Sequence, residues 1–218
     1  MLHIGTDKTG STALQEFFAG NAEALGRHGF VYLKSGRNHR PNHTAIHEPT
    51  LAGDYSWWRR LAKELMASPM PRGLVSFEGF YHLNEAQLRR VRKELAGLAV
   101  KIVIYLRRQS DMVRSGVAQR IKSGQMNLAL AQYTPALLVT IGASYESVLA
   151  RFGAVFGRDN LLVRRYEHGR WPEQNIFLDF LGAIGIGLDG RALQEQFRLP
   201  PGDSNPTLDV ESLHLLDT

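Results

Sequence analysis

The run Val100–Leu106 (VKIVIYL) constrains the fold more than any other part of the sequence. Lys101 is its one charged residue, and apolar side chains occupy both alternating sets of positions. Successive side chains of a β-strand point to opposite faces of the sheet, so both faces of this strand must be covered. Strands of this kind are typical of parallel sheets that carry helices on both faces. The run therefore predicts an inner strand of an α/β protein.

The rest of the chain alternates between apolar runs of strand length and amphipathic stretches of helix length. Besides the run above, we expect strands over 2–4, 30–33, 74–77 and 160–164. We expect helices over about 13–25, 54–68, 84–98, 109–123, 134–156, 171–185 and 208–216. This order predicts an α/β fold with a mostly parallel sheet between two helical layers. Ligands of such sheets bind at the carboxyl ends of the strands.

Length and composition indicate an ordinary globular protein. The 218 residues fit a single domain over 1–218, in which the part from about 186 onward carries the weakest structural signals. The 26 Lys and Arg residues exceed the 21 Asp and Glu residues, which gives a net charge of +5. This excess favours anionic ligands but is too small for a dedicated nucleic-acid-binding protein.

The chain has no cysteine, which excludes disulfides, thiolate metal sites and cysteine nucleophiles. This composition is compatible with the reducing cytoplasm. No stretch approaches the roughly 20 apolar residues of a membrane-spanning helix. The N-terminus runs into a glycine-rich segment where a signal peptide would have its apolar region. We therefore expect a soluble cytoplasmic protein.

The glycine-rich segment Gly5–Thr12 (GTDKTGST) lies between the first expected strand and the first expected helix. A loop in this position directs backbone N–H groups and the positive end of a helix at one place, which suits a phosphate or sulfate group. In the Walker pattern the lysine follows the second glycine, whereas here Ser11 has that position and Lys8 lies inside the loop. A cation there can stabilise the charge that builds on a leaving group. A tight turn with a solvated lysine is the alternative interpretation.

A second anion site is predicted after the run Val100–Leu106. Arg107 leaves this strand at its carboxyl end, and Ser115 lies in the helix expected to follow. A guanidinium group and a hydroxyl group in these positions can bind one anion together. The alternative is a solvated arginine and an incidental helical serine.

Two separated segments resemble the PAPS-dependent sulfotransferase family, specifically its bacterial members related to the carbohydrate sulfotransferases (PAPS is 3′-phosphoadenosine-5′-phosphosulfate). HIGTDKTGSTALQ is similar to the 5′-phosphosulfate loop with its KTGT or KSGT signature, and YLRRQSDMVRSGVAQRIKSG is similar to the 3′-phosphate strand and helix. FGRDNLLVRRYEHGRW and NIFLDFLGAIGI resemble the family more loosely, so the similarity extends to about Gly187. The chain departs from the family at Asp7, where many members have proline, and has no RKGxxGxW segment.

The resemblance implies a three-layer α/β/α sandwich of the P-loop nucleotide-kinase type. It also implies transfer of a sulfuryl group from PAPS to a hydroxyl or amine acceptor, with a carbohydrate favoured, PAP as the product and no metal. The loop that Gly5 opens would bind the 5′-phosphosulfate through Lys8, Thr9, Gly10, Ser11 and Thr12, and Arg107 and Ser115 would bind the 3′-phosphate. The chain stops early for this group, so a native chain that continues past Thr218 stays an open alternative.

Sulfuryl transfer needs a general base that takes the proton of the acceptor. His43 lies in the polar loop after the second expected strand, and Glu78 follows the strand expected over 74–77. We favour His43 slightly, although a loop histidine is more often structural and a strand-end glutamate can simply pair with an arginine. Within the same loop, His39, His43 and His47 suggest a metal site only weakly, because no acidic partner lies at helical spacing.

Three basic residues are candidates for contact with an anionic acceptor, namely Arg37, Arg40 and Lys122. The alternative is that they are simply solvated. Two other functions stay open. A kinase-like phosphoryl transferase with ATP and magnesium predicts a lysine at position 11 and a metal-binding aspartate at a strand end, where this chain has Ser76, Phe77 and Glu78. A non-catalytic nucleotide-binding protein would keep the anion sites without needing a base.

Overall fold

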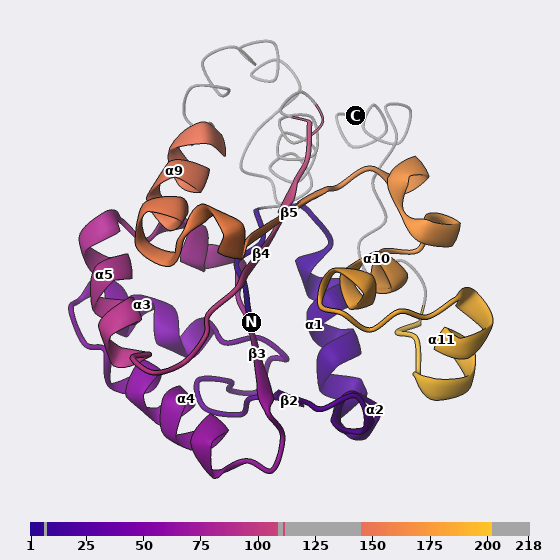
Figure 1. Ribbon diagram of the computed structural model, residues 1–218, viewed down its shortest axis with the longest axis horizontal. Coiled ribbons are helices and arrows are strands. Elements are labelled where there is room, and N and C mark those ends of the chain that lie inside the picture. Colours follow the sequence, from indigo (N-terminus) through magenta and orange to yellow (C-terminus); the bar gives the residue numbers. More distant parts are fainter. Residues whose placement is uncertain (7, 109–110, 112–144, 202–218) are drawn as a thin grey trace, which may run out of the picture.

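The computed structural model describes residues 1–6, 8–108, 111 and 145–201 (Figure 1). Five strands form one sheet in the order β2-β3-β1-β4-β5, and every neighbouring pair is parallel. The strands are β1 (Leu2–His3), β2 (Phe30–Tyr32), β3 (Arg72–Ser76), β4 (Ile102–Leu106) and β5 (Leu161–Arg165). The predicted mostly parallel sheet is confirmed. The expected inner strand 100–106 is β4, which lies between β1 and β5.

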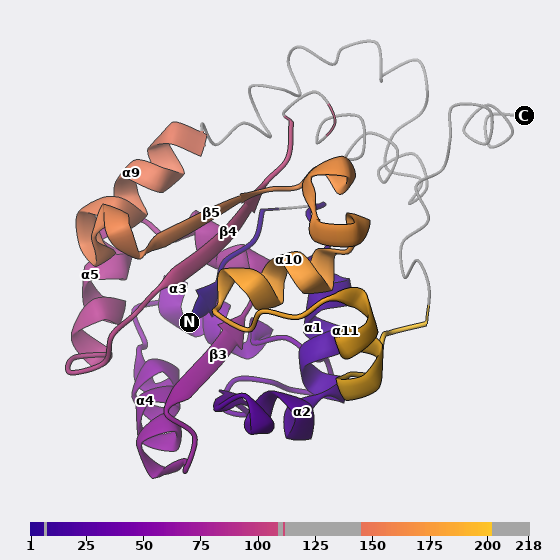
Figure 2. The same ribbon diagram turned by 45° about the vertical axis from the view of Figure 1, so that its right-hand side comes forward.

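Helices cover both faces of the sheet (Figures 1 and 2). One layer holds α3 (His47–Leu51), α4 (Ser56–Ala67), α5 (Glu85–Glu94) and α9 (Tyr145–Phe156). The other layer holds α1 (Ser11–Gly20), α2 (Ala22–Arg27), α10 (Ile176–Ala183) and α11 (Gly190–Gln196). The predicted three-layer α/β/α architecture is therefore confirmed.

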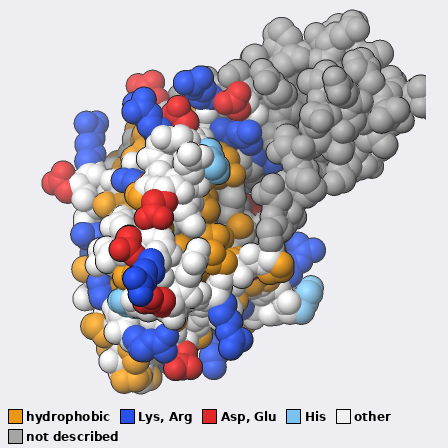
Figure 3. Space-filling view, turned by 90° about the vertical axis from the view of Figure 1, so that its right-hand side faces the viewer, with side chains coloured by type: hydrophobic (Ala, Val, Ile, Leu, Met, Phe, Trp, Pro, Cys, Tyr) orange, Lys and Arg blue, Asp and Glu red, His pale blue; other side chains and the backbone are white. Residues whose placement is uncertain are grey.

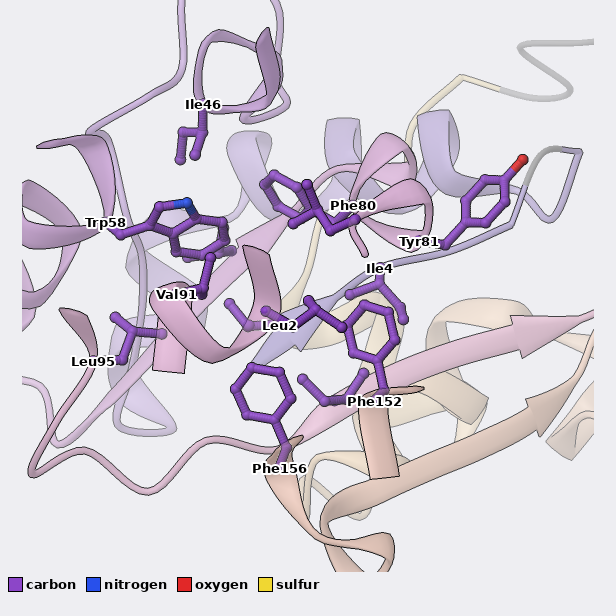
Figure 4. Packing of buried hydrophobic residues seen from close by; sticks show 14 of the residues in the cluster. Leu2, Ile4, Ile46, Trp58, Phe80, Tyr81, Val91, Leu95, Phe152 and Phe156 are labelled. Carbon is purple, nitrogen blue, oxygen red and sulfur yellow. The ribbon is translucent and has the colours of Figure 1, made fainter. Parts of the chain in front are cut away.

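The two helical layers enclose two hydrophobic clusters, one on each face of the sheet. Ile102 and Ile104 of β4 point into the first cluster, and Val103 and Tyr105 point into the second. Figure 4 shows the first cluster, in which Trp58 packs among strand and helix residues. This alternation explains why β4 is apolar at every position, since each face of the strand has its own core.

Polar side chains determine several helix ends. Asn84 accepts a hydrogen bond from the Gln87 backbone N–H at 2.9 Å, and the Gln87 side chain accepts one from the Asn84 N–H at 2.9 Å. This capping box begins α5 where the sequence predicts it, although the helix ends at Glu94 rather than near 98. Asp54 accepts a hydrogen bond from the Ser56 N–H at 2.8 Å just before α4.

The structure differs from prediction at several helices. The expected helix 13–25 is divided at Asn21, whose side chain bonds to Phe17 and to both backbone groups of Arg198. The helix expected from 171 begins at Ile176, because the Asn175 side chain caps its first N–H groups. Helices α3 and α11 were not predicted. The expected helices over 109–123 and 208–216 lie outside the described residues.

No helix in the described part of the chain is both long and apolar enough to cross a membrane.

Candidate active site

The carboxyl ends of four parallel strands meet at one edge of the sheet, and a predicted or newly found site residue follows each of them. Gly5 comes shortly after β1, Glu78 after β3, Arg107 directly after β4, and Tyr166 directly after β5. The parallel arrangement therefore gathers residues that are far apart in the sequence.

The loop after β1 has an unusual backbone conformation. The φ angles are 33° at Gly5, 62° at Lys8 and 72° at Gly10, all in the left-handed region. A Cβ atom at Gly10 would lie 2.9 Å from Ile176 Cδ1 and 3.0 Å from Tyr166 Cε2. Glycine is therefore required at position 10 for both conformation and space. Lys8 adopts its conformation in spite of its side chain, which costs on the order of 1 kcal/mol.

Hydrogen bonds fix this loop to the sheet. The Thr9 hydroxyl donates to the Thr6 carbonyl at 2.6 Å, and the Thr6 hydroxyl donates to the Tyr105 carbonyl at 3.0 Å. Arg107 Nη1 donates to the Lys8 carbonyl at 3.2 Å. Thr6 and Thr9 are buried. The loop is thus tied at several points to the strand that Arg107 follows.

The N-terminus of α1 opens onto this loop. Its first intrahelical hydrogen bond runs from the Leu14 N–H to the Gly10 carbonyl at 3.1 Å, so the preceding N–H groups of the helix have no intrahelical acceptor. No side chain of the described residues caps this end, and its first turn holds no acidic residue. The positive end of the helix dipole and the hydroxyls of Ser11 and Thr12 meet here. The N–H groups at this helix end and the two hydroxyls together suit the phosphate of a nucleotide.

Glu78 lies beside the loop and is held by a buried polar network. A Cβ at Gly5 would lie 3.6 Å from Glu78 Cβ. Gln15 Nε2 donates to Glu78 Oε2 at 2.8 Å and to Ser76 Oγ at 3.3 Å. Ser76 Oγ in turn lies 2.8 Å from His3 Nδ1. The network sets the position of the carboxylate relative to the loop.

His43 is fully buried and bound to the backbone on both sides of its ring. Nε2 lies 2.9 Å from the Leu33 carbonyl, and Nδ1 lies 3.2 Å from the Ser76 N–H. A neutral ring that donates from Nε2 and accepts at Nδ1 satisfies both groups. Burial lowers the pKa of His43 to about 4. The geometry therefore favours a structural role for His43, and of the two candidates only Glu78 is shown beside the glycine-rich loop.

Two residues of this site were not anticipated. Tyr166 packs against Gly10, and the Arg107 guanidinium carbon lies 5.5 Å from the centroid of its ring. Tyr166 follows directly after β5, so the strand-end argument applied to Glu78 would also have found it. Gln15 is the second, and its signal is a polar residue in the apolar stripe of α1 that contains Leu14 and Phe18.

The other predicted residues are placed as follows. Lys8, Gly10 and Arg107 are partly exposed, Thr12 is exposed, and Thr9 and Ser11 are buried in the loop. Ser115 lies outside the described residues. No group of three or more potential metal ligands occurs within residues 1–6, 8–108, 111 and 145–201. On the face shown in Figure 3, basic and acidic side chains are interspersed.

No protein-family model matches this chain. An uncharacterized protein of Archaeoglobus fulgidus is 35% identical over 115 residues, which are 53% of this chain and 30% of that protein. The chain thus spans about a third of the length of this curated relative. Among solved structures, a sulfotransferase from Alicyclobacillus acidocaldarius is similar with a TM-score of 0.51 and 16% identity, covering 99% of this chain and 88% of the other. This similarity shows a sulfotransferase-like fold.

Proposed function

We propose that this chain is a sulfotransferase that moves a sulfuryl group from PAPS to a hydroxyl or amine acceptor. The observation that carries the proposal is the position of Glu78 directly beside a glycine-rich loop that contains Lys8. The loop supplies an anion site with a cation inside it, and the carboxylate supplies a base next to that site. The sulfotransferase-like fold supports the same function.

The donor would be held by two groups of residues. The N–H groups at the start of α1, with the hydroxyls of Ser11 and Thr12, bind the phosphate of the 5′-phosphosulfate. Lys8 stabilises the charge at the oxygen that leaves sulfur. A guanidinium group has five N–H donors, and Arg107 donates one of them to the Lys8 carbonyl. The other donors bind the 3′-phosphate, together with Ser115.

Glu78 acts as the general base. PAPS supplies the sulfuryl group, whose S–O bond to the phosphate breaks so that PAP leaves with the electron pair. Glu78 takes the proton from the acceptor hydroxyl while the acceptor oxygen bonds to sulfur. Gln15, which donates to Oε2 at 2.8 Å, orients the carboxylate for this transfer. His43 serves as a structural link between β2 and β3.

The finer parts of the proposal follow from the family resemblance. The acceptor is a saccharide, and no metal takes part. Chain length and the absence of cysteine, rather than the resemblance, support one domain over 1–218 and the cytoplasm. Arg107 and the loop serve PAPS rather than ATP, because Lys8 stands before the position that a Walker lysine would occupy.

Transfer of labelled sulfate from PAPS to a mixture of saccharides tests the function. We expect labelled product with the wild-type protein and a loss of about 10²- to 10⁴-fold with Glu78→Gln, as for removal of a general base. The matched control is Gln87→Ala, which removes the capping box of α5 away from the loop and should leave turnover intact. Phosphoryl transfer from ATP with magnesium, in place of sulfate transfer, would contradict the proposal.

A further inference from the structure

We infer that Arg37 binds a carboxylate or sulfate group on the acceptor, so that this protein acts on anionic acceptors. The inference rests on the proposed function, because that function places an acceptor beside Glu78. Its evidence comes from other residues. Arg37 lies in the loop 34–43 between β2 and η1 (Thr44–Ile46), a short 3₁₀ helix. We call this segment the acceptor loop.

The first turn of the acceptor loop is firmly anchored. The backbone N–H groups of Lys34 and Ser35 donate to the two carboxylate oxygens of Glu64 at 2.7 and 2.8 Å. The Arg37 N–H donates to the Lys34 carbonyl at 3.0 Å, which closes the turn. Gly36 has a φ of 85°, and a Cβ there would lie 2.3 Å from Ile46 Cγ1. The backbone that carries Arg37 therefore has little freedom.

The far end of the acceptor loop is anchored beside the candidate base. The Tyr32 hydroxyl donates to the Pro41 carbonyl at 2.6 Å. His43, the last residue of the loop, bonds to Leu33 and to Ser76, and Ser76 lies two residues before Glu78. The loop is thus closed onto the carboxyl ends of β2 and β3, where an acceptor must lie to reach Glu78.

The Arg37 side chain is positioned but incompletely bonded. Its guanidinium carbon lies 4.7 Å from the centroid of the Tyr32 ring. Its Nε is buried and has no hydrogen-bond partner among the described residues. Arg37 forms no ion pair with a carboxylate in this part of the chain, whereas Arg89 and Arg164 do. Arg37 as a whole is partly exposed, and its Nη groups donate no hydrogen bond to the described residues, so a ligand oxyanion can bind at this end of the guanidinium group.

The charges of Arg37 and Glu78 both affect the pKa of the Tyr32 hydroxyl. Burial raises the pKa of the Tyr32 hydroxyl, the Arg37 cation lowers it, and the Glu78 carboxylate raises it. Of these two charges, Arg37 lies directly over the Tyr32 ring, and the described residues include no ion pair between Arg37 and Glu78. An acceptor whose anionic group rests on Arg37 would bring a neighbouring hydroxyl toward Glu78. The planar guanidinium group suits the paired oxygens of a carboxylate or sulfate.

Binding of small sugar probes tests this inference. Methyl β-glucuronide, methyl glucoside 6-sulfate and methyl β-glucoside are titrated by ligand-observed NMR, with and without saturating PAP. We expect the wild-type protein to prefer at least one anionic probe over the neutral one. Arg37→Gln should lower the affinity for that probe by about 10- to 100-fold, the usual range for hydrogen bonds to a charged group. The comparison of glucuronide with sulfate shows which anion is recognised.

Lys34→Gln is the matched control, because Lys34 is an exposed cation on the same loop that is not among the candidates for acceptor contact. It should leave the preference unchanged. Equal binding of all probes, absence of binding by any probe, or an unchanged preference in Arg37→Gln would overturn the inference. PAP binding measured by calorimetry on the same variants separates the two claims. If Arg37→Gln keeps PAP affinity and loses affinity for the anionic probe, the donor proposal and the inference about Arg37 are both supported. If the wild-type protein fails to bind PAP, only the donor proposal is contradicted.

Discussion

Lys8 holds a backbone conformation, with φ at 62°, that residues with a side chain rarely adopt. Glycine would adopt it without strain, so the lysine is explained better by its charge than by the conformation of the loop. Lys8→Gly and Lys8→Ala should both lower the rate of sulfate transfer by about 10²- to 10³-fold, as for loss of one group that stabilises transition-state charge. Lys8→Gly should be the more stable of the two by roughly 1 kcal/mol.

The rates are measured with labelled PAPS, and the stabilities by urea unfolding. A rate near that of the wild-type protein in either variant would show that Lys8 takes no part in transfer.

His43 and Glu78 were rival candidates for the base, and matched substitutions separate them. Glu78→Gln keeps the shape of the side chain and should lose most of the turnover while keeping PAP affinity. His43→Gln should keep turnover per folded molecule but lower the free energy of unfolding by about 1–3 kcal/mol, because two buried backbone groups lose partners. The opposite pattern, with turnover lost only in His43→Gln, would restore the histidine as the base.

The position of a single residue could be predicted from the sequence where one general rule determined it. The position of Glu78 beside the loop follows from the rule that parallel strand ends gather. The bonding of His43 depends on the backbone of Leu33 and Ser76, which belong to two different strand ends, and no local pattern reports it. The anchoring of Arg37 likewise depends on Glu64 from α4 and is visible only in three dimensions.

At the scale of elements, Asp179 ties α10 to the sheet. Its buried carboxylate accepts a hydrogen bond from the Tyr105 hydroxyl of β4 at 2.6 Å and pairs with Arg164 of β5. Asp179→Ala leaves a partly buried guanidinium and a buried phenol unsatisfied. We expect the free energy of unfolding to fall by about 3–5 kcal/mol.

The control for Asp179 is Glu195→Ala, which breaks the exposed pair with Arg191 on α11. This variant should change the free energy of unfolding by less than about 1 kcal/mol. Denaturant unfolding of both variants checks the prediction. Equal effects of the two substitutions would show that the pair of Asp179 with Arg164 does not hold α10 in place.

Most elements were predictable because their signals are local. The strands expected over 30–33, 74–77 and 160–164 correspond to β2, β3 and β5 within about two residues at each end. Helix α11 (GRALQEQ) was missed because it begins with glycine and has one buried apolar residue, Leu193. The break at Asn21 was missed because its cause is a contact with Arg198.

For the whole molecule, two buried histidines make stability depend on pH. Burial lowers the pKa of His3 from the usual 6.5 to about 3 and that of His43 to about 4. Both rings stay neutral in the folded state, whereas the unfolded chain takes up protons below pH 6.5. Their contribution is therefore complete above pH 6.5 and declines as the pH falls from 6.5 toward 4 and 3.

Between pH 6 and 5, the free energy of unfolding should fall by about 1.4 kcal/mol per pH unit for each histidine. Urea titrations at several pH values measure this slope. His43→Gln should reduce it by about 1.4 kcal/mol per pH unit. A slope that stays the same in this variant would mean that His43 is protonated equally in both states.

The overall layer arrangement was predictable, but the strand order was not. Apolar strands that alternate with helices require a parallel sheet covered on both faces. The order β2-β3-β1-β4-β5, by contrast, depends on which crossover packs on which face. The glycine-rich loop after β1 was recognisable because all its residues are consecutive, whereas the acceptor loop needed the positions of β2, β3 and α4.

The central claim is that the loop after β1 binds a nucleotide with a 3′-phosphate. Calorimetric titration of the full chain with PAP, AMP and ATP, with and without magnesium, tests it most directly. We expect PAP to bind at least tenfold more tightly than AMP, and Arg107→Gln to reduce this preference, because hydrogen bonds to a charged group contribute about 1.5–3 kcal/mol. Tighter binding of ATP that requires magnesium would contradict the claim.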